Sequence, residues 1–122
     1  MVRGFKLLGL LFCNSLVVHY IIKKKIIMQP FAFDLTNEDI KREKNKAREL
    51  RKTQWWKRCC AKGLCVYCQK KVFPKELTMD HVVPVSRGGK STRGNVVCSC
   101  KECNNIKKQM LPVEWALYLD SK

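Results

Sequence analysis

Acidic residues are scarce in this sequence. Its 122 residues contain 10 Asp and Glu against 25 Lys and Arg, which gives a formal net charge of +15 at pH 7. Such an excess of positive charge favours a polyanionic partner, because Lys and Arg neutralise phosphates and release their counterions without reading any sequence. Charge alone does not distinguish a nucleic acid from an anionic membrane surface.

The sequence also lacks internal repeats and low-complexity linkers, which argues against a chain of separate domains. A length of 122 residues suits one domain. We expect residues 28–58 to form a helical extension of a domain at residues 59–122. A block of about 60 residues buries only a small core, so a structural metal would supply much of its folding free energy.

Long apolar runs are scarce as well. The stretch from Leu7 to Ile22 contains polar residues and is shorter than the ~20 residues of a membrane-spanning helix. No small-residue cleavage site of a secretory signal follows it. Residues 1–27 are therefore a doubtful leader: a start codon assigned too early, with Met28 as the true start, a short membrane anchor, or a signal peptide. We favour Met28 as the true start and expect no membrane partner. We do not expect His19 to be a metal ligand.

Cysteine, in contrast, is abundant, with eight residues. Four of them form two Cys-x2-Cys pairs, Cys65 with Cys68 and Cys100 with Cys103. Paired thiolates at this spacing hold Zn²⁺ tetrahedrally in structural sites. A secreted protein with disulfides is the alternative for a short cysteine-rich chain. We favour structural zinc, which implies a reducing compartment, and expect Cys98 to pack at the end of a strand rather than to compete as a ligand.

A basic helix is predicted to begin at Thr36. Thr36 and Asp39 have the spacing of a capping box, and the run that follows is rich in helix-forming residues. We expect the helix to close at Trp55 and Trp56, one of which would pack against the zinc site. A charged run of this kind is often only a solvated helix face. Between Lys41 and Arg58 the run contains nine basic residues: Lys41, Arg42, Lys44, Lys46, Arg48, Arg51, Lys52, Lys57 and Arg58.

Two strands and a second helix are predicted in the C-terminal half. Residues 77–83 and 95–98 are apolar or β-branched enough for strands, and a Gly-rich loop at 86–93 separates them. Residues 101–110 are predicted to form a helix that ends before Pro112. A short amphipathic tail after Pro112 is expected to pack on the core.

Short motifs follow one another in a fixed order between about Trp55 and Trp115. In this order and spacing they resemble the HNH endonuclease family, specifically its branch with four zinc-binding cysteines. The resemblance implies a small α+β fold, in which a ββα-metal core is stapled by a four-cysteine zinc site and preceded by the basic helix. The motifs are Cys65-Val66-Tyr67-Cys68, Asp80-His81 within 78–89, Gly88-Gly89, Gly94-Asn95-Val96-Val97 and Cys100-Lys101-Glu102-Cys103-Asn104-Asn105.

The resemblance also implies roles for individual residues. His81 is expected to be the general base, Asp80 a ligand of a catalytic Mg²⁺ or Mn²⁺, and Asn95 the residue that orients the base through backbone contacts. The second ligand is expected at Asn104, where many family members carry His. Asn105 remains an alternative for that ligand, and the neutral amide oxygen leaves the metal preference open.

The implied partner is DNA, with no small-molecule substrate, in a cytoplasmic setting of a prokaryote or a phage. The rival hypothesis is a non-catalytic zinc module that binds nucleic acid and needs no Asp-His pair. Basic side chains are expected to contact the DNA phosphates, and such contacts position DNA but carry no sequence information. The residues expected to make them are Arg87, Lys90, Arg93, Lys107, Lys108, Arg48, Arg51 and Lys52.

Overall fold

The computed structural model describes residues 34–122, which belong to one compact unit, Phe33–Lys122. The leader at residues 1–27 lies outside the described residues. Within them, no helix is long and apolar enough to cross a membrane. In chain order the elements are α2 (Asn37–Lys52), α3 (Gln54–Ala61), the 3₁₀ helix Pro74–Glu76, β1 (Thr78–His81), the 3₁₀ helix Val85–Arg87, β2 (Val96–Ser99), α4 (Lys101–Lys107) and α5 (Pro112–Asp120).

The basic helix begins as predicted but ends early. The Thr36 side chain accepts a hydrogen bond from the Asp39 backbone amide, and the Asp39 carboxylate accepts one from the Thr36 backbone amide, which completes the capping box. The chain then leaves helical geometry at Thr53, whose hydroxyl accepts a hydrogen bond from the Trp56 backbone at 3.2 Å and caps α3. The expectation of one helix closing at the two tryptophans was therefore wrong, because Thr53 divides it.

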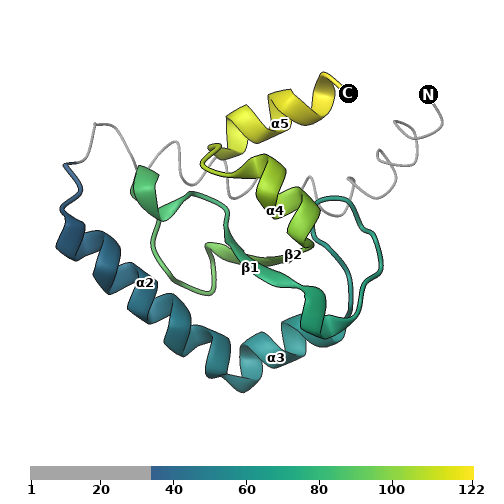
Figure 1. The fold of residues 1–122 in the computed structure, drawn as a ribbon, viewed down its shortest axis with the longest axis horizontal. Helices are drawn as coiled ribbons and strands as arrows, with labels where there is room; N and C mark the ends of the chain where they lie inside the picture. The colour runs from purple at the N-terminus through teal and green to yellow at the C-terminus, as the bar shows by residue number, and fades with distance from the viewer. Residues whose placement is uncertain (1–33) are drawn as a thin grey trace. The chain divides into compact units, whose positions relative to one another are not determined.

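The two strands form an antiparallel pair in which Thr78 faces Ser99 and His81 faces Val96. Helix α3 lies on one side of this pair and α4 on the other (Figure 1). Side chains alternate along a strand, so successive residues of β1 serve opposite sides. Asp80 therefore turns toward α4, whereas His81 turns toward the loop that precedes β2.

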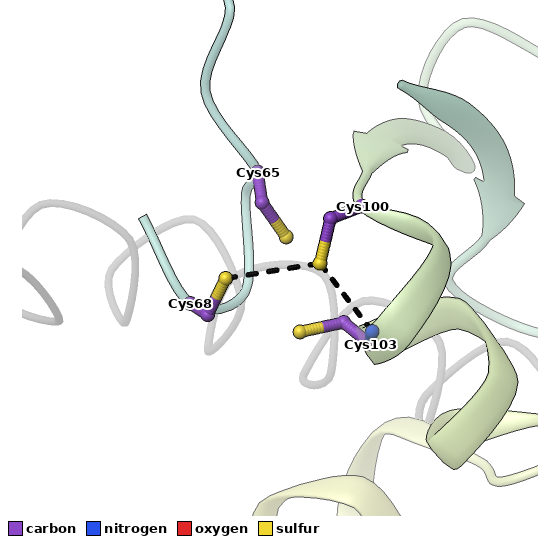
Figure 2. A group of neighbouring side chains, drawn as sticks. All are labelled: Cys65, Cys68, Cys100 and Cys103. Carbon is purple, nitrogen blue, oxygen red and sulfur yellow. Dashed lines mark hydrogen bonds between the residues drawn. The ribbon is translucent and has the colours of Figure 1, made fainter. Parts of the chain in front are cut away.

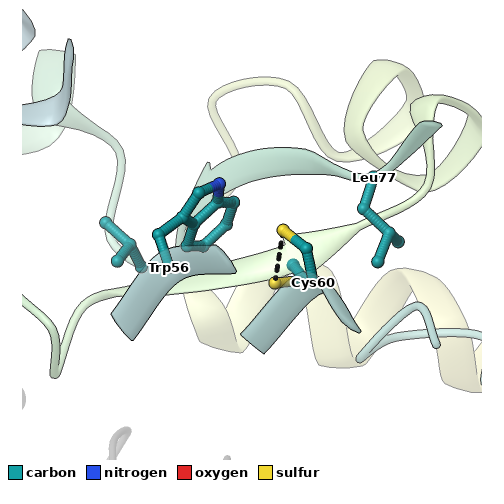
Figure 3. Packing of buried hydrophobic residues seen from close by; sticks show 5 residues of the cluster. Trp56, Cys60 and Leu77 are labelled. Atoms are coloured by element: carbon teal, nitrogen blue, oxygen red, sulfur yellow. Dashed lines mark hydrogen bonds between the residues drawn. The ribbon is translucent and has the colours of Figure 1, made fainter. Parts of the chain in front are cut away.

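The core between α3 and the sheet is small. Trp56, Cys60 and Leu77 lie together in it (Figure 3), packed with Val96 and Cys98. The sulfurs of Cys60 and Cys98 are 3.5 Å apart. Cys98 therefore packs in the core, as expected, and does not join the other cysteine pairs. A tryptophan of the predicted pair does pack in the core, but not against the four-cysteine cluster.

A second cluster forms around the paired cysteines, and its tryptophan is Trp115 of α5. Trp115 is 4% exposed and meets the Tyr67 ring edge to face, with ring centroids 5.4 Å apart. The C-terminal tail thus packs on the core as predicted. Helix α4 is shorter than predicted, because Lys108 adopts a positive φ of 47° and ends it. The two strands and the helix that follows them confirm the predicted small α+β fold.

Candidate functional site

Four cysteine sulfurs converge at the end of β2 and the start of α4. Cys65 and Cys68 come from a turn that precedes β1, Cys100 is the N-cap residue of α4, and Cys103 lies in the first turn of that helix (Figure 2). All four Sγ atoms lie within 4.8 Å of one another. A tetrahedral zinc with Zn–S bonds of ~2.3 Å requires sulfurs about 3.8 Å apart. The Cys68 and Cys100 sulfurs are 3.9 Å apart, so the cluster is close to the size of such a site.

Backbone amides point at these sulfurs. Tyr67 donates to Cys65, Lys70 to Cys68 and Cys103 to Cys100, each with a nitrogen to sulfur distance of 3.4 Å. Burial and the neighbouring Cys65 raise the pKa of the Cys68 and Cys103 thiols. Four thiolates in one place are unfavourable unless a cation compensates their charge. The donor set and its spacing therefore fit a metal ion, and an all-sulfur set is typical of structural zinc.

Asp80 is held from two sides through a single oxygen. Its Oδ2 accepts a hydrogen bond from the Tyr67 hydroxyl at 2.5 Å and forms an ion pair with the Lys107 ammonium at 3.0 Å. Oδ1 takes part in neither contact. Asp80 is 5% exposed and Lys107 1%, so both charges are buried and each compensates the other. Burial and the adjacent Asp80 raise the pKa of Tyr67 well above its usual range, which keeps its hydroxyl a donor.

The clamp on Asp80 originates in the metal cluster. Tyr67 lies between Cys65 and Cys68, so the turn that presents two sulfurs also presents the hydroxyl that holds the carboxylate. Lys107 comes from α4, the helix that Cys100 caps, and its ammonium also donates to the His81 carbonyl at 2.9 Å. The position of the carboxylate therefore depends on both halves of the cysteine cluster.

His81 is half-buried at the end of β1. Its Nε2 lies 2.9 Å from the Ser91 hydroxyl. Burial lowers the pKa of His81, and the nearby cations of Lys107 and Arg51 lower it further, against the opposing effect of Asp80. The imidazole is therefore neutral near pH 7 and available to accept a proton.

Asn95 immediately precedes β2 and is 1% exposed. Its side-chain oxygen accepts a hydrogen bond from the Val83 amide at 3.0 Å, and its side-chain nitrogen donates to the carbonyls of Val83 and Lys90. It therefore ties together the two ends of the loop that follows His81. These backbone contacts are of the kind expected for a residue that orients the base.

Asn104 lies on α4, opposite β1. Its Nδ2 donates to the Thr78 hydroxyl at 2.9 Å, and that hydroxyl donates its own hydrogen to the Ser99 carbonyl at 3.0 Å. The Thr78 hydroxyl has one hydrogen and donates it to the Ser99 carbonyl, so it accepts a hydrogen bond from Asn104. The atom of Asn104 that faces Thr78 is therefore the amide nitrogen. Asn104 Oδ1 thus remains for another partner.

One open cleft of about 430 Å³ brings three of the four predicted catalytic residues together; Asn95 does not line it. Asp80, His81 and Asn104 all line it, whereas Asn105 does not. Two lysines line it as well, Lys44 from α2 and Lys108 from the end of α4. The cleft therefore combines a neutral imidazole, two oxygen-bearing side chains and two cations.

The basic residues predicted to contact nucleic acid have different surroundings. Lys107 is buried against Asp80, so it does not offer its charge to a surface ligand and the expectation of a phosphate contact was wrong for it. Lys108 lines the cleft, and Arg51 lies beside it, 4.0 Å from the Met79 sulfur. The others are placed as follows: Arg87 pairs with Glu114, Lys52 with Glu49, Arg48 contacts Asn45, Arg93 covers the Trp55 ring, and Lys90 is half-buried.

Sequence reasoning missed the roles of several residues around the site. Tyr67 and Lys107 hold Asp80, Glu43 and Ser91 support His81, and Lys44 lines the cleft. One weak signal was available, because Glu43 is an acid within a strongly basic helix. No pattern in the sequence indicated the roles of the others.

Comparison with known families confirms the resemblance. Residues 65–116 match the family model described as HNH endonuclease. The matched range begins at the first cysteine of the cluster and includes Asp80, His81, Asn95 and Asn104. Among curated proteins, none matches the chain.

Proposed function

We propose that this protein is a metal-dependent DNA endonuclease that hydrolyses phosphodiester bonds, because residues 65–116 match the family model described as HNH endonuclease. The observation that carries the proposal is that His81, Asp80 and Asn104 line one cleft. Phosphodiester hydrolysis needs a proton acceptor for the attacking water and stabilisation of negative charge on the phosphate. The cleft offers residues for both tasks.

His81 serves as the general base. Its lowered pKa keeps the ring unprotonated at neutral pH, and its place at the end of β1 sets it at the wall of the cleft. Asn95 and Lys107 support it through the backbone, Asn95 by bonding Val83 and Lys107 by bonding the His81 carbonyl. A base held in this way loses little orientational freedom before it accepts the proton of the attacking water.

Asp80 and Asn104 are the candidates to hold a divalent cation. Each presents an oxygen that its hydrogen bonds do not use, Oδ1 in both residues. Carboxylate and amide oxygens suit Mg²⁺ or Mn²⁺. Such a cation, when bound, would stabilise negative charge on the phosphoryl and leaving oxygens.

The four-cysteine cluster would hold a structural Zn²⁺ and DNA would be the partner. Lys44 and Lys108 line the cleft and Arg51 lies beside it, where each could neutralise a phosphate flanking the scissile one. Thiolates that bind zinc must stay reduced, which favours a cytoplasmic location.

The deciding experiment is plasmid cleavage by the zinc-loaded full chain across a panel of divalent metals. His81→Ala should slow cleavage by roughly 10²–10⁴-fold, the usual contribution of general-base catalysis. Asp80→Ala should abolish the response to added Mg²⁺ or Mn²⁺, whereas Asn104→His should stay active with an altered metal preference. His19→Ala, which changes the only other histidine, is the matched control and should cut at the parent rate.

Zinc content and DNA affinity should be measured on every variant. Both should be unchanged in His81→Ala, because neither the cysteine cluster nor the cationic side chains are altered. If His81→Ala cuts as fast as the parent and Asp80→Ala still responds to metal, the dyad is not catalytic. A zinc module that only binds nucleic acid would then be the better description.

A further inference from the structure

Ser91 connects the candidate base to the basic helix. Its hydroxyl lies 2.9 Å from His81 Nε2 and 2.7 Å from the Glu43 carbonyl oxygen of α2. Its backbone amide donates to the Glu43 carboxylate at 2.7 Å. Ser91 is 8% exposed and Glu43 2%, so both side chains are largely shielded from water.

The number of hydrogens at the junction determines how His81 is protonated. A serine hydroxyl has one hydrogen, and a backbone carbonyl can only accept. The Ser91 hydrogen therefore goes to the Glu43 carbonyl, and toward His81 the same oxygen can only accept. It follows that Nε2 carries the ring hydrogen, which leaves Nδ1 of the neutral ring with a free lone pair.

Glu43 is an unusual residue in its helix. Its neighbours are mostly basic, and a buried carboxylate is costly unless it is paired and hydrogen-bonded. Here the Ser91 amide and the Lys46 ammonium, the latter at 3.1 Å, satisfy its two oxygens. Glu43 thus binds Ser91 twice, through its backbone carbonyl and through its side chain.

We propose that Ser91 is a positioning residue that holds His81 as the Nε2–H tautomer, and that Glu43 fixes Ser91 in this role. Helix α2 is then part of the active site rather than only a basic surface for DNA. The catalytic meaning rests on the proposed nuclease function, because Nδ1 would be the atom that accepts the proton of water. The tautomer itself is a property of the resting protein and does not depend on that function.

The test is nitrogen NMR of the imidazole in the zinc-loaded full chain at pH 8, without a catalytic metal. The chain contains only two histidines, so His19→Gln leaves His81 as the single ring. Protonated and unprotonated ring nitrogens resonate far apart, which identifies the tautomer directly. We expect Nε2 to be protonated and Nδ1 unprotonated; a protonated Nδ1 or an even mixture in the parent protein would overturn the proposal.

Variants then test the role of the junction. Ser91→Ala should shift the His81 signals toward a mixture of tautomers and lower kcat by roughly 10–100-fold at unchanged KM, as is usual for a supporting hydrogen bond. Glu43→Gln keeps the backbone carbonyl and an oxygen for the Ser91 amide, so it should retain the parent tautomer. Unchanged imidazole signals in Ser91→Ala would contradict the proposal.

The outcomes separate the two ideas. A protein with the expected tautomer that never cuts DNA would support the positioning role and refute the nuclease function. A protein whose cleavage requires His81 but whose Nδ1 is protonated would support the nuclease function and refute the positioning role. The tautomer is read in a chain with the native junction, so this measurement does not depend on a Ser91 or Glu43 variant that could fail to fold.

Discussion

Replacing Lys107 by Met tests whether the buried ion pair holds the site together. Lys107 is 1% exposed, and its ammonium binds Asp80 Oδ2 at 3.0 Å and the His81 carbonyl at 2.9 Å. Methionine has a similar length and no charge. The Asp80 carboxylate would stay buried with the Tyr67 hydroxyl as the remaining donor to Oδ2.

The expected cost is large for a single substitution. Removing one partner of a buried ion pair typically costs about 3–5 kcal/mol, because the other charge is left uncompensated. With a urea dependence of about 1–3 kcal/mol per molar for a small protein, the unfolding midpoint should fall by roughly 2 M. The assay is urea unfolding followed by tryptophan fluorescence at a fixed, saturating zinc concentration, since bound metal contributes to apparent stability.

The adjacent lysine provides the control. Lys108→Met removes the same charge from an exposed side chain that forms no ion pair with Asp80, and it should change stability by less than about 0.5 kcal/mol. Combining Lys107→Met with Asp80→Asn should cost less than the sum of the two single changes, because no lone charge remains. If Lys107→Met is as stable as Lys108→Met, the reasoning about the buried pair is wrong.

Two further predictions concern the metal cluster and the loop after His81. Cys68→Ser should lose bound zinc and unfold at neutral pH, because three thiolates cannot close a structural site, whereas Cys59→Ser should keep the parent zinc content by elemental analysis. Gly89→Ala should cost more than about 3 kcal/mol in urea unfolding, because its Cβ would lie 1.7 Å from the Val83 carbonyl oxygen. Gly94→Ala is the matched control, since nothing lies within 4 Å of its Cβ, and an equal effect of the two changes would refute the steric argument.

The sequence predicted those features that local chemistry specifies. The capping box at Thr36 involves two residues three positions apart, and the structure has it as predicted. The metal site could be predicted from the two cysteine pairs as well, because two cysteines at an x2 spacing can direct both sulfurs to one point. The positions of the strands followed from short apolar runs between turn residues, although β1 is shorter than predicted.

The features that were missed depend on contacts between distant parts of the chain. The junction of Glu43 with Ser91 spans 48 positions, and neither residue type suggests the other. Lys107 was expected to contact phosphate, but α4 turns it onto the buried Asp80. Thr53 was different: it is a preferred capping residue, and the helix-forming residues on both sides of it concealed the break.

The two hydroxyls beside the cleft orient their partners by the same logic. Ser91 and Thr78 each donate a single hydrogen to a backbone carbonyl, so each can only accept from the side chain that it supports. The result is a protonated Nε2 in His81 and an Oδ1 in Asn104 that the bond to Thr78 does not use. Both carbonyls have fixed positions in the folded backbone. The hydrogen bonds that they accept from Ser91 and Thr78 therefore determine which atoms His81 and Asn104 leave available. Substitutions at such supporting positions should therefore change catalysis without removing any group that contacts the substrate.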